Sequence, residues 1–244
     1  MREIMEALGA QHAELDVTLA PLDDADWARP SRCPGWTVAD VVLHLSQTDE
    51  LAAANARGDS GGADWAGGDV DASVDAAVAR ERGAPPAEVL RRWRAAAAAV
   101  HETLAAADPK QPIPWAVGSL PARTLATTRL AECWIHTGDV LHGLGVRQEP
   151  TDRLWHIARL AWRTLPYAFA KDGREPAGGF GLKLRAPDGS TWEFGLDDDP
   201  ATVVRGDAVG FCLVAARRTG PERVDLSASG PDCDRVLDVV RTFA

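Results

Sequence analysis

Two histidines and one glutamate are the residues of this sequence whose types and spacing best suit metal chemistry. Glu132 and His136 are four positions apart, so on a helix both side chains project from the same side. Taken alone, such a pair is more typical of ordinary surface or core residues. His44 stands in an otherwise apolar stretch, where a buried imidazole needs a polar partner. If the helices that carry them are neighbours, the three side chains supply the donor set of an open catalytic zinc site.

Two further residues follow His136 on the same predicted helix. Asp139 lies about one turn beyond and could accept the ring N–H of His136, as carboxylates behind metal-binding histidines commonly do. It could equally solvate the end of the helix. His142 adds another imidazole, and the sequence leaves open whether this ring faces a metal or solvent. The donor types favour zinc, with iron, nickel or manganese as alternatives.

The elements that must position these residues are helical in the first part of the chain. Apolar residues recur every three to four positions in five segments, four of which are expected to form a bundle. The clearest helix start lies at Thr37, because Thr37 and Asp40 are spaced as a capping box just after a Pro-Gly pair. The five expected helices span residues 2–20, 38–56, 86–107, 122–143 and 152–169.

The pattern changes after about residue 175. Residues 180–185 and 191–196 alternate in polarity around a Pro-Asp-Gly-Ser turn, which predicts a β-hairpin. A helix at about 207–218, a strand at 223–228 and a final helix at about 232–243 would complete a small unit. The expected fold class is therefore α+β, with a helical metal-binding bundle over residues 1–170 and a small α+β domain over residues 171–244.

Composition limits the function classes. The 244 residues hold 26 basic and 36 acidic side chains, a net charge of −10, which argues against nucleic acid or an anionic membrane as partner. No apolar run is long enough for a spanning helix, and the first residues carry acids where a signal peptide carries bases. The four scattered cysteines form no metal or redox pair. We expect a cytoplasmic monomer or small homo-oligomer that acts on a small molecule.

A glycine-rich stretch, residues 58–68, contains a tempting serine. The Gly-Asp-Ser-Gly-Gly string resembles nucleophile motifs, but it lacks the strand-turn-helix context of a nucleophile elbow and the upstream β-barrels of a trypsin-like site. A serine nucleophile is therefore rejected, and the stretch is interpreted as a mobile loop. Trp65 in this loop is explained equally well by a lid over the site or by disorder.

Residues 33–45, C-P-G-W-T-V-A-D-V-V-L-H-L, and the segment from Glu132 to Asp139 resemble a known family. Both are similar to the metal-binding DinB-like proteins typified by mycothiol-dependent maleylpyruvate isomerase. The resemblance extends to residues 203–213, which look like part of the small α+β domain that follows the bundle in these proteins. It implies a divalent metal, most commonly zinc, bound by His44, Glu132 and His136.

The resemblance also implies an activity. Three protein ligands leave a coordination position at which mycothiol could become a thiolate nucleophile, either for isomerisation or for transfer to a small electrophilic metabolite. Arg217 and Arg218 match loosely the arginine that is thought to assist substrate carboxylates in the isomerase. Two alternatives stay open: a metal-dependent hydrolase or natural-product isomerase or cyclase without mycothiol, and a non-enzymatic small-molecule carrier with a structural metal.

Overall fold

The computed structural model describes residues 1–59, 70–116 and 118–242, which divide into two compact units. The units are Met1–Gln148 and Glu149–Ala244. The first is a helical bundle and the second combines helices with a sheet, so the α+β fold class is confirmed. Ser60 and Trp65, and with them most of the glycine-rich stretch, lie outside the described residues.

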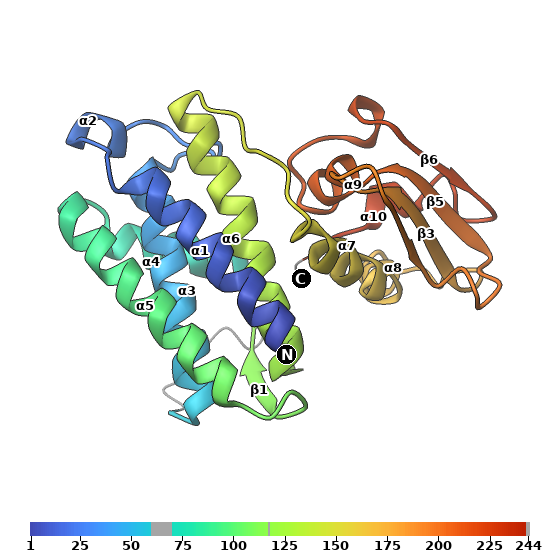
Figure 1. The fold of residues 1–244 in the computed structure, drawn as a ribbon, viewed down its shortest axis with the longest axis horizontal. Coiled ribbons are helices and arrows are strands. Elements are labelled where there is room, and N and C mark those ends of the chain that lie inside the picture. Colours follow the sequence, from blue (N-terminus) through green and yellow to red (C-terminus); the bar gives the residue numbers. More distant parts are fainter. Residues whose placement is uncertain (60–69, 117, 243–244) are drawn as a thin grey trace. The chain divides into compact units, whose positions relative to one another are not determined.

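The first unit is built around four long helices, α1, α3, α5 and α6, which pack alongside one another (Figure 1). The sequence pattern predicted each of them to within a residue or two. It did not predict the short helices α2 and α4 or the two-stranded antiparallel sheet of β1 and β2. The bounds are α1 Arg2–Leu19, α2 Asp24–Trp27, α3 Val38–Arg57, α4 Val70–Glu81, α5 Pro86–Ala106, β1 Pro112–Trp115, β2 Gly118–Pro121 and α6 Ala122–Leu144.

Helix α3 starts as the sequence predicts. The hydroxyl of Thr37 accepts from the backbone N–H of Asp40, and the Asp40 carboxylate accepts from the backbone N–H of Thr37. This capping box satisfies two amide groups that have no partner inside the helix. Just before it, Gly35 adopts a φ of 78°, a left-handed conformation that side chains disfavour. The turn and the cap together fix where the helix that carries His44 begins.

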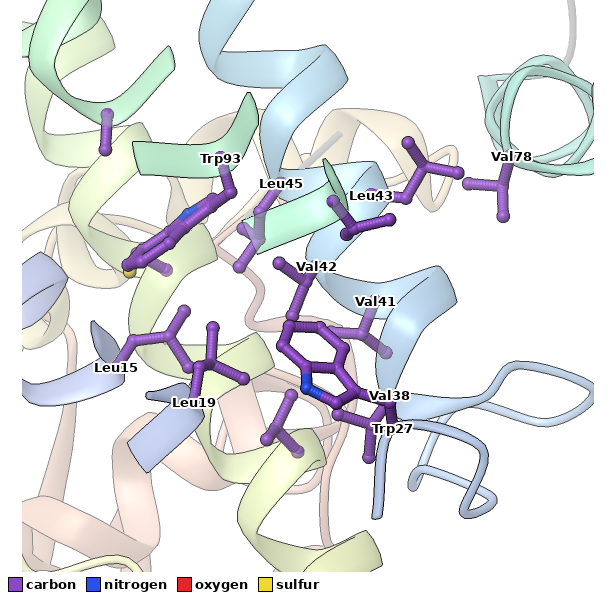
Figure 2. Packing of buried hydrophobic residues seen from close by; sticks show 14 residues of the cluster. Leu15, Leu19, Trp27, Val38, Val41, Val42, Leu43, Leu45, Val78 and Trp93 are labelled. Atoms are coloured by element: carbon purple, nitrogen blue, oxygen red, sulfur yellow. The ribbon is translucent and has the colours of Figure 1, made fainter. Parts of the chain in front are cut away.

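Apolar side chains from all six helices of the first unit contribute to its core. Trp27 of α2 and Trp93 of α5 are buried against aliphatic residues of α1 and α3 (Figure 2). Burying a large ring removes much apolar surface from water, and such residues typically dominate the energetics of a core. The core therefore packs α3 against the other helices of the unit. The labelled members in Figure 2 are Leu15, Leu19, Trp27, Val38, Val41, Val42, Leu43, Leu45, Val78 and Trp93.

The second unit contains a four-stranded sheet in the order β4-β3-β5-β6, in which β3 and β5 are parallel and the other pairs antiparallel. The predicted hairpin is confirmed as β3 and β4, with Leu182 opposite Phe194. Helix α7 packs on α9 and on this hairpin. The bounds are α7 Leu154–Arg163, α8 Leu165–Lys171, β3 Phe180–Arg185, β4 Thr191–Phe194, β5 Thr202–Asp207, α9 Ala208–Ala215, η1 Pro221–Arg223, β6 Leu226–Ser229 and α10 Val236–Val239.

Three predictions for this unit need correction. The single helix expected over residues 152–169 is two helices, because Pro166 has no N–H to continue α7 and Thr164 bonds back to the carbonyl of Leu160. The last helix begins only at Val236, after Arg235, whose guanidinium pairs with Asp172. The strand expected at residues 223–228 is a turn of 3-10 helix followed by β6, and strand β5 was not predicted as an element.

The boundary between the units falls at residue 148, whereas the sequence pattern suggested residue 170. Helices α7 and α8 continue the helical periodicity of the first part of the chain, which explains the expectation. Their apolar faces nevertheless pack within the second unit, where α7 contacts α9, β3 and β4. Within the described residues, no helix has the length and apolar character needed to cross a membrane.

Candidate metal centre

Helices α3 and α6 bring together the three residues that the sequence singled out as metal ligands. The Nε2 atom of His44 lies 3.6 Å from Oε2 of Glu132, and Nε2 of His136 lies 3.6 Å from the same oxygen. The two imidazole rings meet edge to face with their centroids 4.8 Å apart. The three donor atoms thus all lie within 4.8 Å of one another, a separation that a single cation can bridge.

The other nitrogen of His136 faces Asp139, as expected from their spacing. Nδ1 of His136 lies 3.0 Å from Oδ2 of Asp139, whose side chain is fully buried. A carboxylate can only accept here, so Nδ1 carries the hydrogen. In a neutral His136 this contact leaves the lone pair on Nε2, the nitrogen that points toward Glu132.

The thiol of Cys33 joins this arrangement, a contact that sequence reasoning missed. Its Sγ donates to Oδ2 of Asp139 at 3.2 Å and lies 3.9 Å from Nδ1 of His136. Among the described residues, the two groups of three potential ligands therefore share His136. The available signal was the position of Cys33 as the first residue of the 33–45 motif, which places it one turn before α3.

An indole ring stands beside His44. The ring of Trp36 lies 5.3 Å from that of His44, tilted by 53°, and its Nε1 donates to Asp75 of α4 at 2.9 Å. Arg82, just beyond α4, donates to Asp40 and to the carbonyl of Gly35. Helix α4 is thus tied by polar contacts to the segment that precedes and begins α3, and it holds an aromatic surface next to a candidate ligand.

The charges of the three donors are strongly coupled. Burial alone would raise the pKa of Glu132, but its hydrogen bonds with His136 and His44 hold this pKa well below the usual range. Burial lowers the pKa of His44, so this imidazole is neutral near pH 7. Burial would also lower the pKa of His136, but its contacts with Asp139, Cys33 and Glu132 outweigh this effect and raise the pKa well above normal.

This electrostatic pattern fits a cation site. In the chain alone, a proton on His136 offsets the carboxylates of Glu132 and Asp139, so the pocket already stabilises one positive charge. Two imidazoles and one carboxylate match the donor set of open zinc sites, and the neutral His44 is ready to coordinate. The residues present therefore suit a divalent metal ion.

The remaining residues of interest lie elsewhere. His142 is exposed in the last turn of α6, one turn beyond Asp139, so its ring faces solvent rather than the cluster. Arg217 and Arg218 belong to the second unit and follow α9 directly. Arg217 is exposed with a φ of 59°, and Arg218 donates to the carbonyl of Ala216 at 3.0 Å.

Comparisons with known proteins add a family context. A family model described as the mycothiol maleylpyruvate isomerase N-terminal domain matches residues 8–141. Two uncharacterised proteins of Mycobacterium tuberculosis, from strains CDC 1551 / Oshkosh and ATCC 25618 / H37Rv, are each 36% identical over 241 residues. These alignments cover 97% of this chain and 93% of each relative.

The fold is also that of solved structures. The crystal structure of the mycothiol-dependent maleylpyruvate isomerase superposes with a TM-score of 0.65 at 19% identity. A histidine-to-alanine mutant of that enzyme gives 0.62 at 20% identity. Each comparison covers 93% of this chain and 92% of the other, so the similarity includes both units.

Proposed function

Because the chain belongs to the mycothiol maleylpyruvate isomerase family, we propose that it is a metal- and mycothiol-dependent enzyme that acts on a small electrophilic metabolite. The observation that carries the proposal is the convergence of His44, Glu132 and His136 from two helices far apart in sequence. The family match alone would not assign roles to these side chains. Their distances and charges provide the chemical support.

In this proposal His44, Glu132 and His136 hold a divalent cation, with zinc preferred by the donor types. Three protein ligands leave a coordination position, and an ion bound there would lower the pKa of a thiol enough to give a nucleophile near neutral pH. Isomerisation and thiol transfer share this requirement, and they differ in the electrophile that the enzyme accepts.

The chain's own residues would prepare the site. Asp139 keeps the hydrogen of His136 on Nδ1, which directs Nε2 to the cation. Glu132 supplies the negative charge that offsets a dication. Trp36, held by Asp75, presents an apolar face beside His44 and would limit the access of water to that side.

We also propose a role for Arg217 and Arg218, as cations for a carboxylate group of the substrate. A chain with a net charge of −10 attracts no dicarboxylate by its overall field, so such a substrate would need a local cation. Guanidinium groups suit carboxylates because their paired N–H groups match the two oxygens.

The test is a calorimetric titration of mycothiol into the zinc-loaded protein and into protein stripped by a chelator. We expect binding to the zinc-loaded form and none to the stripped form. His136→Ala, treated with zinc in the same way, should behave like the stripped protein, whereas the exposed His142→Ala should behave like the wild type.

A matched assay would use the same four samples: zinc-loaded wild type, stripped wild type, His136→Ala and His142→Ala. It would follow the isomerisation of maleylpyruvate and the transfer of the thiol to other electrophiles. Turnover only with zinc and mycothiol together supports the proposal. Turnover by the zinc-loaded protein without any thiol would contradict it and would favour a hydrolase or a Lewis-acid isomerase instead.

A further inference from the structure

A buried ion pair lies between the two helices that carry the candidate ligands. Arg129 of α6 and Asp49 of α3 are both 1% exposed. Arg129 lies about one turn before Glu132, and Asp49 lies just over one turn after His44. Charged side chains are almost never buried so completely unless they are paired, so this pair needs an explanation.

The contacts of Arg129 lead directly to the backbone of a candidate ligand. Its Nε donates to Oδ1 of Asp49 at 2.8 Å, and its Nη2 donates to the hydroxyl of Thr48 at 2.8 Å. That hydroxyl donates in turn to the carbonyl of His44 at 2.9 Å. The guanidinium of Arg129 thus donates hydrogen bonds to two consecutive residues of α3, Asp49 and Thr48. Thr48 in turn bonds to the backbone of His44.

Asp49 depends on Arg129 for its hydrogen bonding. Among the described residues, the second oxygen of Asp49, Oδ2, has no hydrogen-bond partner, and the nearby Nε2 of His12 lies 3.7 Å away. The indole of Trp115 covers the guanidinium from β1, at 5.8 Å. The pair is therefore shielded from water, and its geometry is set by a few fixed neighbours.

The charge of Arg129 does not by itself favour metal binding, so electrostatics does not explain why a guanidinium is buried beside the candidate ligands. The charge of Arg129 is among the influences that lower the pKa of Glu132 and of His44, so the guanidinium is close enough for its field to act on the cluster. That field repels an incoming metal ion. Buried ion pairs also contribute little net stability, and their best-attested use is to fix the register of packed helices.

We propose that Arg129 is a positioning residue for the metal centre: through Asp49 and Thr48 it fixes α3 against α6 so that His44 meets Glu132 and His136. The inference rests on the proposed function, because it assigns a purpose to the alignment of the three donors. Arg129 does not touch the metal or the substrate; it acts through the helix that carries His44.

The experiment measures the affinity of the metal-free protein for zinc, by competition with a chromophoric chelator, in the wild type and in Arg129→Met. Methionine has a similar length and no charge. The variant therefore removes both the hydrogen bonds to α3 and the electrostatic repulsion between Arg129 and the metal ion. A positioning role predicts zinc binding at least tenfold weaker than in the wild type. Unchanged or tighter zinc binding would overturn the inference, because it would show that Arg129 affects the metal only through charge repulsion and not through the position of α3.

Two companion variants separate positioning from general destabilisation. Leu104→Ala removes a buried side chain from α5 and leaves the contacts of Arg129 in place, so its zinc affinity should stay within about twofold of the wild type. Arg129→Lys keeps the charge but lacks the planar fork that reaches Asp49 and Thr48 together, and it should also bind zinc weakly. Wild-type affinity in Arg129→Lys would contradict the inference.

If Arg129→Met fails to fold because Asp49 is left as an unpaired buried charge, the double variant Arg129→Met/Asp49→Leu removes both charges. It should fold and still bind zinc at least tenfold more weakly than the wild type. Wild-type affinity in this double variant would refute the inference and leave the proposed function intact. A wild-type protein that binds no zinc would refute both.

Discussion

Nδ1 of His136 lies 3.0 Å from Oδ2 of the fully buried Asp139, and this contact decides which nitrogen of the imidazole can bind a metal. The two residues are three apart on α6, so the helix itself sets their distance. The same oxygen of Asp139 also accepts from Cys33. The orientation of the His136 ring is thus fixed from the side opposite to Glu132.

We therefore expect Asp139→Ala to weaken zinc binding by about 10- to 100-fold, the usual effect of removing a carboxylate behind a metal-binding histidine. Chelator competition on the metal-free protein would measure the change. His142→Ala is the matched control on the same helix, because its exposed ring is remote from the cluster, and its affinity should not change. An Asp139→Ala variant that binds zinc as well as the wild type would show that this contact does not orient the ring.

Zinc affinity should rise with pH. Asp139, Cys33 and Glu132 overcome the burial of His136 and raise its pKa well above normal, so near neutral pH the metal-free protein carries a proton on this ring. Coordination through Nε2 must expel that proton, whereas His44, whose pKa is lowered, has none to lose. The affinity should increase about tenfold per pH unit up to the raised pKa of His136 and level off above it.

Calorimetry in buffers of different ionisation enthalpy would count the proton that leaves. A release of about one proton per zinc near pH 7 is expected for the wild type. A binding enthalpy that is the same in all buffers would rule out a protonated His136 in the metal-free site.

The capping box of α3 should contribute to stability on the scale measured for other N-caps. Thr37→Ala removes the hydroxyl that accepts from the amide of Asp40, and we expect it to lower the free energy of unfolding by about 0.5–2 kcal/mol. Urea unfolding of the metal-free protein would measure this. Thr127→Ala, the same substitution inside α6, should change stability by less than about 0.5 kcal/mol. Equal effects of the two substitutions would show that the capping hydrogen bond of Thr37 adds nothing to stability beyond that of an ordinary helical threonine.

The proposed cations of the second unit can be tested one at a time. If either assists a substrate carboxylate, Arg217→Met or Arg218→Met should lower kcat/KM for a carboxylate-bearing electrophile by about tenfold or more, a loss of roughly 1.4 kcal/mol. Zinc and mycothiol affinities should stay as in the wild type. If both variants turn over such a substrate normally, the role belongs to another residue.

The helices that carry the site were predictable because local sequence determines them. Thr37 and Asp40 define the start of α3 through contacts three residues apart, and Glu132 and His136 share a face at helical spacing. Whether His44 meets that face depends on how the bundle packs. The residues alone predicted the three-residue site only on the assumption that the two helices are neighbours. The family resemblance supplied that pairing, and the structure brings the three donors together.

Other features were missed for different reasons. Helix α4 repeats valine every four residues, at Val70, Val74 and Val78, a helical signal that sequence reasoning passed over. Its buried residue is Val78, and polar contacts such as that of Asp75 with Trp36 also hold the helix. Strand β1 contains Pro112 and Pro114, residues that normally argue against a strand. The contact of Cys33 with Asp139 joins residues 106 positions apart, and no spacing rule could reveal it.

Metal analysis tests the central claim most directly. Protein purified without chelators, dialysed against zinc and then freed of unbound ions should contain one zinc per chain by mass spectrometry. His44→Ala, Glu132→Ala and His136→Ala should each lose most of it, while His142→Ala keeps one. A wild type that holds no stoichiometric zinc, or three variants that retain it, would contradict the account.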